Sequence, residues 1–209
     1  MWQKHKTFWL QKPFVYSVLL GMLFLAISML ANSYANSYTV SHASNYVSDI
    51  FLDNLPVVDV HLIFSEGAVA FILILAGILF YEPKYLPFTL KGIAAFILIR
   101  SFFLVLTHIA PPLHEIYINP TDWIARVSSG DDLFFSSHTG LPFLLAFIFW
   151  NQKRLRYFFF ACSAIGGVAV LLGHLHYSID VFSALFISFG IFHICKNLFP
   201  KDYSLIVNS

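Results

Sequence analysis

Residues 155–199 read LRYFFFACSAIGGVAVLLGHLHYSIDVFSALFISFGIFHICKNLF, and this stretch decides the fold. Two long apolar runs flank a polar segment, GHLHYSID, at residues 173–180. A hydrocarbon core about 30 Å thick is crossed by a helix of about 20 apolar residues. The stretch therefore predicts two membrane-spanning helices joined by a tight polar turn.

The composition of the whole chain agrees with this prediction. Of its 209 residues, 58% are hydrophobic and 11% are charged, and the mean hydropathy is +0.75. An ordinary soluble domain carries about 25% charged residues, so the composition excludes that class. The net charge of +1 gives no broad basic surface, and we expect no nucleic-acid partner. Cys162 and Cys195 both fall in apolar runs and are expected to be core residues.

Four further apolar runs complete the predicted fold, an all-α integral membrane protein with six transmembrane helices in a single domain, residues 1–209. The predicted spans are Phe14–Asn32, Val57–Tyr81, Leu86–Thr107, His138–Trp150, Leu155–Gly173 and Ile179–Phe199. The fourth span is short, so we expect it to begin below the membrane surface or to have a polar first turn that lines a site. The first span also fits a signal peptide, although its apolar run exceeds the usual length of about 7–15 residues.

Basic residues in the loops predict the orientation, because cytoplasmic loops are enriched in Lys and Arg. With the N-terminus inside, ten of the 12 basic residues fall on the inner side. Arg126 falls on the outer side, and Arg100 lies within the third span. We therefore expect both termini in the cytoplasm and the active site at the outer face, toward a periplasm, a lumen or the exterior.

Four ionisable residues are predicted to meet at that outer face. His138 opens the fourth span, His174 and His176 lie in the turn before the sixth, and Asp180 begins the sixth. His176 and Asp180 are four residues apart and share one helix face. The carboxylate is expected to hold one ring nitrogen, which leaves the other available as a nucleophile or base. His174 taken alone is expected to be a hydrated interfacial group.

His138 lies at a predicted helix start, between Ser137 and Thr139. A helix N-terminus presents N–H groups and a positive dipole end, which suit phosphate. A histidine at that place could protonate a departing alkoxide oxygen. The three residues therefore predict a phosphate-binding turn that also carries a general acid.

Arg100 has two interpretations that the sequence leaves open. It lies about seven residues, or about 10 Å, below the outer end of the third span, and Glu66 in the second span lies at a similar depth. A buried Arg100–Glu66 ion pair would hold the two spans in register. Alternatively, Arg100 binds the substrate phosphate.

Three segments resemble the type 2 phosphatidic acid phosphatase superfamily and, within it, the sphingomyelin synthase branch. GDDLFFSSHT, residues 130–139, looks like that branch's Gly-Asp…Ser-Gly-His-Thr segment, and HLHYSID, residues 174–180, looks like its His-x-His-Tyr-Thr-x-Asp segment. Arg100 and Thr107, followed by two prolines, are similar to its Arg-x6-Thr segment. The resemblance covers about residues 57–199.

The resemblance implies a metal-independent lipid phosphotransferase or phosphatase without a cofactor, acting through a phosphohistidine. In it His176 attacks phosphorus, Asp180 orients His176, and His138 protonates the leaving oxygen and then activates the acceptor. The residues implied in phosphate binding are Arg100, Ser137 and Thr139. The residues implied in supporting roles are Asp132, His174, Tyr177 and Glu66.

The chain also departs from the superfamily pattern. Ser137 replaces the usual Gly, the Lys-x6-Arg-Pro motif is missing, and Ala169-Val170 stand where phosphatases have Ser-Arg before the nucleophilic histidine. These losses favour the synthase-like branch, with Arg100 as the substitute phosphate ligand.

The sequence leaves the reaction itself open. Transfer of a phospholipid head group to diacylglycerol or ceramide is favoured over hydrolysis of a phospholipid or lipid phosphate. A second reading is a metal-dependent enzyme in which His138, His174, His176 and Asp180 are the metal ligands. A channel, transporter or scaffold is a third reading. The oligomeric state has no signature in the sequence.

Overall fold

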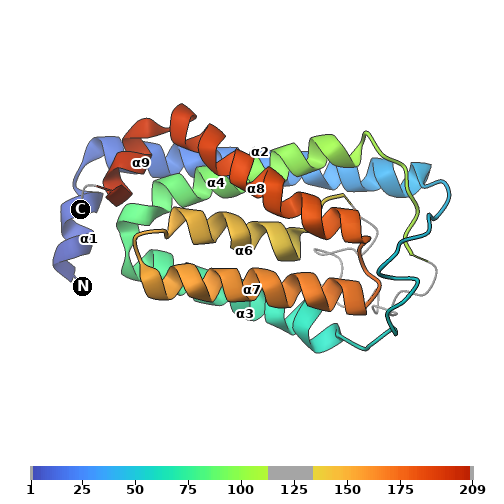
Figure 1. The fold of residues 1–209 in the computed structure, drawn as a ribbon. Coiled ribbons are helices and arrows are strands. Elements are labelled where there is room, and N and C mark those ends of the chain that lie inside the picture. The colour runs from blue at the N-terminus through green and yellow to red at the C-terminus, as the bar shows by residue number, and fades with distance from the viewer. Residues whose placement is uncertain (1, 113–133, 208–209) are drawn as a thin grey trace.

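The computed structural model describes residues 2–112 and 134–207, in which the regular structure is helical. The helices are α1 (Trp2–Trp9), α2 (Lys12–His42), α3 (Gly67–Tyr81), α4 (Leu86–Leu104), α6 (Ser137–Ile148), α7 (Lys153–Leu172), α8 (Ser178–Leu198) and α9 (Pro200–Val207). A π-helical turn, Leu62–Glu66, leads into α3, and a 3-10 turn, Pro83–Tyr85, leads into α4. The long helices run side by side as a bundle (Figure 1).

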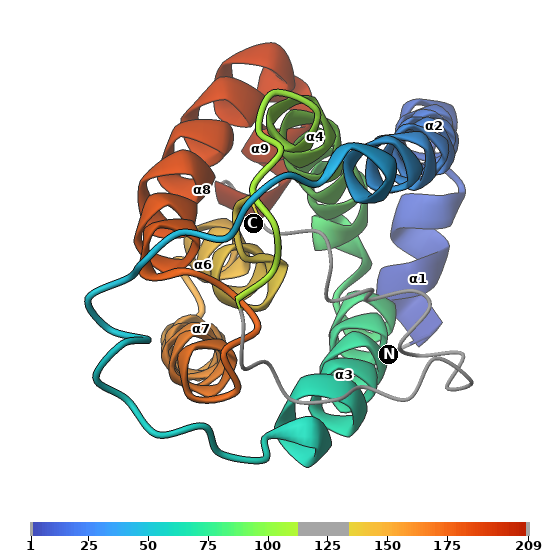
Figure 2. The same cartoon turned by 90° about the vertical axis from the view of Figure 1, so that its right-hand side faces the viewer.

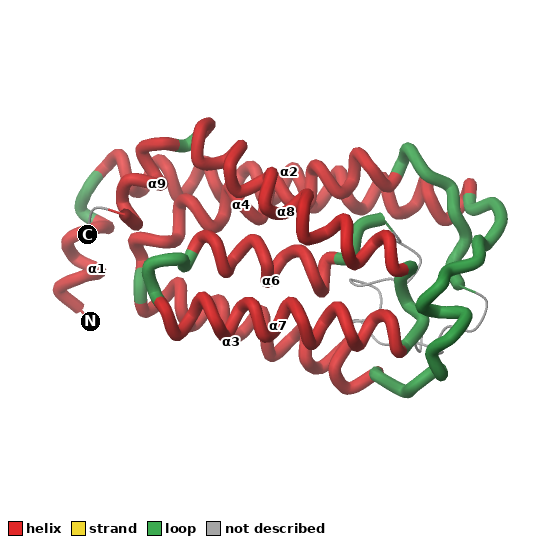
Figure 3. The backbone as a smooth tube through the Cα atoms, in the orientation of Figure 1, coloured by secondary structure: helices red, strands yellow, loops and turns green. Residues whose placement is uncertain are grey.

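Both the first and the last helix, α1 and α9, lie at one end of the bundle (Figure 1), which we call the proximal end. The opposite end is the distal end, and Figure 3 shows the longer loops gathered there. This placement fits an even number of membrane crossings. The location of the termini in the cytoplasm stays a prediction.

Within the described ranges, five helical segments are long and apolar enough to cross a membrane: Lys12–His42, Leu62–Tyr81, Pro83–Leu104, Lys153–Leu172 and Ser178–Leu198. The remaining predicted span, the fourth, corresponds to α6, which has 12 residues and is about 18 Å long. A hydrocarbon core is about 30 Å thick. Figure 1 shows that α6 begins well short of the distal ends of α7 and α8. The total of six spans stays a prediction.

The largest difference from the predicted boundaries concerns the first span. It was expected to end at Asn32, but α2 continues to His42. The second predicted span begins late, with the π-helical turn at Leu62, and the third ends early, at Leu104. Polar residues after position 31 look like a loop in the sequence, whereas in the structure several of them line a cavity and remain helical.

The apolar core has two parts. The larger one lies between α3, α4, α6, α7, α8 and α9 and is rich in phenylalanine; its fully buried members include Phe88, Phe96, Phe135, Phe149 and Phe159. The smaller one lies at the distal end and joins Leu52 and Val60 to Val170, Leu175 and Val181. The connection from α2 to the π-helical turn thus packs over the distal end. Its Val58 N–H donates to the Leu172 carbonyl at 2.8 Å.

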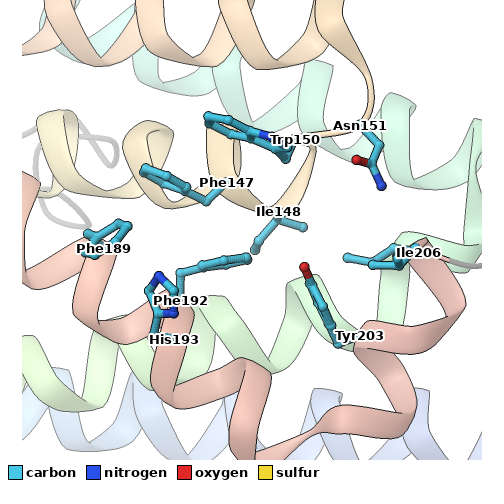
Figure 4. A pocket seen from close by; sticks show the side chains of 10 residues that line it. Phe147, Ile148, Trp150, Asn151, Phe189, Phe192, His193, Tyr203 and Ile206 are labelled. Atoms are coloured by element: carbon cyan, nitrogen blue, oxygen red, sulfur yellow. The ribbon is translucent and has the colours of Figure 1, made fainter.

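A buried polar cluster lies at the proximal end. Lys91 Nζ donates to Asp202 Oδ2 at 2.5 Å and to Ser17 Oγ at 2.6 Å. Ser17 Oγ in turn donates to Asp202 Oδ1 at 2.6 Å. These three residues tie α4, α9 and α2 together. A small cavity of about 190 Å³ lies nearby between α6, α8 and α9, with His193, Tyr203 and several aromatic rings around it (Figure 4).

Candidate active site

A cavity of about 850 Å³ occupies the distal half of the bundle. Residues of α2, α3, α4, α6 and α7 line it, together with the turn before α8. Figure 2 looks onto the distal end and shows α6 with α3, α4, α7 and α8 around it. Four predicted site residues line this cavity: Arg100, Ser137, His138 and His176. The fold thus brings three segments that are far apart in sequence to the wall of one cavity.

His176 and Asp180 form a buried pair at the start of α8. His176 Nδ1 lies 3.4 Å from Asp180 Oδ2, and both residues are less than 5% exposed. The same carboxylate oxygen accepts the Tyr177 N–H at 2.9 Å, which caps the first turn of α8. Nδ1 of His176 therefore faces the carboxylate, and Nε2 is the ring nitrogen on the opposite side.

His138 lies in the first turn of α6, held against the π-helical turn. Its ring stacks on Phe64, with centroids 4.3 Å apart and an interplanar angle of 25°. Its Nε2 lies 3.3 Å from the Phe64 carbonyl oxygen. Turns of π-helix are frequent at functional sites. Phe64 therefore fixes the orientation of the His138 ring from two sides.

Close packing of α7 also positions the first turn of α6. A Cβ at Gly166 would lie 2.4 Å from the His138 carbonyl oxygen, so only glycine allows this approach. One helical turn earlier, Ser163 Oγ donates to the Thr139 carbonyl at 2.8 Å. The two motifs meet directly as well, since the Ser136 N–H donates to the Asp180 carbonyl at 3.1 Å.

Arg100 is buried, only 4% exposed, and lies on the wall of the cavity. Its Nε donates to the Phe135 carbonyl at 2.8 Å, just ahead of α6. Glu66 is exposed, and its Oε2 lies 3.6 Å from His61 Nδ1. The Arg100–Glu66 ion pair is not formed among the described residues, and phosphate binding by Arg100 stays a prediction.

His174 corrects one expectation, because it is buried rather than hydrated. It has a φ of 52°, in the left-handed region, and it follows Gly173, the C-cap of α7. Its N–H donates to Leu171 O, and the next N–H, of Leu175, donates to Val170 O. This is a Schellman motif. His174 Nε2 also lies 3.2 Å from the Leu55 carbonyl, so the residue shapes the turn that carries His176.

The other predicted site residues have mostly structural surroundings. Tyr177 is buried, and its hydroxyl donates to Ala110 O at 2.9 Å and accepts the Val47 N–H at 3.2 Å. Thr139 is buried, with its Oγ1 3.4 Å from Ser136 Oγ. Asp132 lies outside the described residues. Cys195 is fully buried as expected, but Cys162 is only partly buried and lines the cavity.

Asp49 is a residue that sequence reasoning missed. Its Oδ2 accepts the N–H of Ser178 at 2.7 Å and the Ser178 hydroxyl at 2.8 Å, at the start of α8. Burial alone would raise the pKa of this carboxyl, but the hydrogen bonds from Ser178, Leu52 and Phe51 outweigh it, and the pKa lies below its usual value. Nothing in the sequence near Asp49 indicates this contact with α8. Phe64 and Gly166 were missed as well, for the same reason.

Among the residues that the structure describes, the potential metal ligands are dispersed. In the described ranges, no three His, Cys, Asp or Glu side chains are placed so as to hold a metal ion together. Metal independence stays a prediction for the experiment below.

Residues 130–197 match a protein-family model described as PAP2 superfamily C-terminal. The matched segment holds both histidine motifs and includes α6, α7 and nearly all of α8. A comparison with curated proteins gave no match. The family match supports the PAP2 superfamily and a lipid enzyme of the phosphatase or phosphotransferase type. Together with the apolar helices, it indicates a multi-pass membrane protein.

Proposed function

We propose that the protein is a membrane-embedded lipid phosphotransferase of the sphingomyelin synthase type, which moves a phospho-head group between lipids through a phosphohistidine. The observation that carries the proposal is the distal cavity. His138, His176 and Arg100 line it, and the Asp180 carboxylate contacts Nδ1 of His176. A buried histidine–carboxylate pair and a second histidine on the wall of the same cavity supply the groups needed for nucleophilic attack with general acid catalysis.

In the first step, His176 Nε2 attacks the phosphorus of a donor phospholipid. The N–P bond forms, the P–O bond to the diacylglycerol oxygen breaks, and His138 gives that oxygen its proton. Asp180 stabilises the positive charge that develops on the His176 ring. The products are diacylglycerol and a phosphohistidine that still carries the head group.

In the second step, the acceptor hydroxyl attacks the same phosphorus from the side that the diacylglycerol left. Its proton passes to His138, the new P–O bond forms, and the N–P bond breaks. A lipid hydroxyl as acceptor gives head-group transfer, whereas water gives hydrolysis. The chemistry is the same in both cases, so exclusion of water from the cavity decides between them.

Negative charge builds up on the non-bridging phosphate oxygens in both steps. Arg100 lies buried on the cavity wall, where it donates a hydrogen bond to the carbonyl of Phe135, just before α6. The first turn of α6 adds N–H groups that have no acceptor within the helix. Fixed donors aimed at developing charge commonly contribute 10²–10³-fold to turnover, or about 3–4 kcal/mol each.

The test uses the purified protein, a fluorescent phospholipid and excess EDTA, with and without a diacylglycerol or ceramide acceptor. We expect a fluorescent head-group product that depends on the lipid acceptor, survives EDTA and is lost in His176→Ala. Release of the head group regardless of acceptor would identify a hydrolase of the same superfamily. Activity lost in EDTA and restored by a metal ion would overturn metal independence. No turnover with any lipid would favour a channel, transporter or scaffold.

A further inference from the structure

A polar strip runs along the distal third of α2, on the cavity wall. It consists of Asn32, Ser33, Asn36 and Ser37, all of which line the cavity. Residues separated by four positions lie on one helix face, so the two asparagines and the two serines form adjacent rows. Ser and Asn side chains in membrane helices usually bond to a neighbouring helix, whereas these four line a cavity. The mechanism above uses none of them.

Hydrogen bonds between α2 and α4 show that the strip lies at the depth of the reacting groups. Ser101 Oγ lies 3.4 Å from Asn32 Oδ1, and Thr39 Oγ1 lies 3.2 Å from the Leu104 carbonyl. Asn36 lies between these two contacts along α2. Arg100 precedes Ser101 in α4 and bonds to Phe135, two residues before α6. The strip is therefore level with Arg100 and with the first turn of α6.

Asn36 has an unsatisfied acceptor at this place. Its Oδ1 is enclosed and has no hydrogen-bond partner in the described structure. An enclosed polar atom without a partner is rare in folded proteins and is costly unless something binds it. A carbonyl oxygen accepts hydrogen bonds only from donors, that is, from hydroxyl, amide or ammonium groups.

We infer that the polar strip of α2 is the acceptor subsite, which holds the hydroxyl- or amide-bearing backbone of the second lipid. The inference rests on the proposed transfer function. The unsatisfied Asn36 Oδ1 is an acceptor, which a phosphate oxygen cannot satisfy, so it suits neutral donor groups, whereas Arg100 and α6 attract phosphate. A lipid held there keeps its reacting hydroxyl at the depth of His138. It also occupies space that water would otherwise fill.

The experiment measures two reactions separately in detergent–lipid micelles. Donor cleavage is followed as diacylglycerol released in a single turnover without acceptor, and transfer is followed at varied concentrations of a short-chain ceramide or diacylglycerol. The variants are Asn36→Leu, which removes the hydrogen-bonding amide, and Asn36→Gln, which keeps an amide. Tyr34→Leu is the matched control, because Tyr34 lies on α2 but is exposed on its outer side.

We expect Asn36→Leu to cleave the donor at the wild-type rate and to raise the acceptor KM about tenfold, the usual effect of one lost hydrogen bond. Asn36→Gln should recover part of this loss, and Tyr34→Leu should show none. Unchanged acceptor KM in a folded Asn36→Leu protein that transfers normally would overturn the subsite. The subsite would also be overturned if the wild-type protein cleaved the donor but transferred the head group to no lipid hydroxyl. Failure of the wild-type protein to cleave the donor would instead refute the proposed function.

Discussion

The two ends of the bundle handle buried polar groups in opposite ways. At the proximal end, Lys91, Asp202 and Ser17 bond to one another in a closed triangle. At the distal end, His138, His176 and Arg100 are held from one side and face a cavity of about 850 Å³ on the other. A structural role, holding helices together, is enough to explain a polar cluster whose members bond only to one another. Polar groups held at the wall of a cavity imply a ligand.

The comparison also separates residues that look alike in the sequence. His193 and His138 are both histidines of apolar helices. His193 is exposed beside the small proximal cavity of about 190 Å³ (Figure 4). His138 is stacked on Phe64 and wedged against Gly166. Only His138 lines the large cavity together with Arg100 and His176, so the two ends predict different consequences of substitution.

The largest effect is expected for the distal histidines. His138→Asn and His176→Asn should each lower kcat at least about 10³-fold, because each removes a group that takes part in the reaction. His193→Asn should change kcat less than about twofold, because surface positions tolerate substitution. Initial rates with a fluorescent phospholipid measure all three. Comparable losses in His193→Asn would remove the distinction between the two ends.

The second largest effect is on stability, at the proximal end. Asp202→Ala leaves Lys91 buried without its carboxylate, and breaking a buried pair this way costs about 3–5 kcal/mol. Thermal unfolding in detergent should show a much lower Tm, while the molecules that remain folded keep the wild-type kcat. The double variant Lys91→Met/Asp202→Leu should regain most of the stability. If the double variant were as unstable as Asp202→Ala, charge pairing would not be the cause.

A smaller effect is expected where α7 meets α6. Gly166→Ala places a methyl group against the His138 carbonyl, and overpacking of this kind costs about 1–3 kcal/mol. The shift should misplace His138 and lower kcat about 10–100-fold. The matched control is Gly190→Ala, because a Cβ at Gly190 meets no atom within 4 Å. Equal kcat values for the two variants would show that this close approach does not position His138.

The smallest effect concerns Asp49 and depends on pH. The pKa of its carboxyl is lowered by hydrogen bonds despite partial burial, so the stabilisation is present above its usual pKa of 3.8 and is lost as the pH falls below it. Asp49→Asn should cost about 1 kcal/mol at neutral pH, because an NH2 group replaces one of the two oxygens that accept hydrogen bonds. Chemical unfolding of both proteins between about pH 7 and 3 should show this difference shrinking on acidification. A difference that stays constant with pH would contradict the assignment.

The sequence predicted the apolar helices well because their signal is local. The sixth span was predicted at Ile179–Phe199, and α8 covers Ser178–Leu198. The end of α2 was missed because Asn32, Ser33 and Asn36 look like the beginning of a loop. Their side chains face a cavity, and a cavity formed by five helices leaves no local trace in the sequence.

In the candidate site, too, local features were predicted and long-range contacts were not. The spacing of His176 and Asp180 predicted that they lie together, and Nδ1 of His176 is 3.4 Å from Oδ2 of Asp180. The shared helix face was wrong as the reason, because His176 lies in the turn before α8, which begins at Ser178. The sequence could not predict contacts between distant segments, such as those of Asp49 with Ser178 and of Phe64 with His138. They depend on how the connection after α2 and the π-helical turn pack, which only the assembled bundle determines.

The central claim is that His176 becomes covalently phosphorylated. The direct measurement is a rapid-quench single turnover with a phospholipid labelled at phosphorus, followed by peptide mapping of the protein. The account predicts a label on His176 that is stable in alkali and labile in acid, that disappears when acceptor lipid is added, and that does not form in His176→Asn. Turnover at the normal rate with no label on His176 would contradict it.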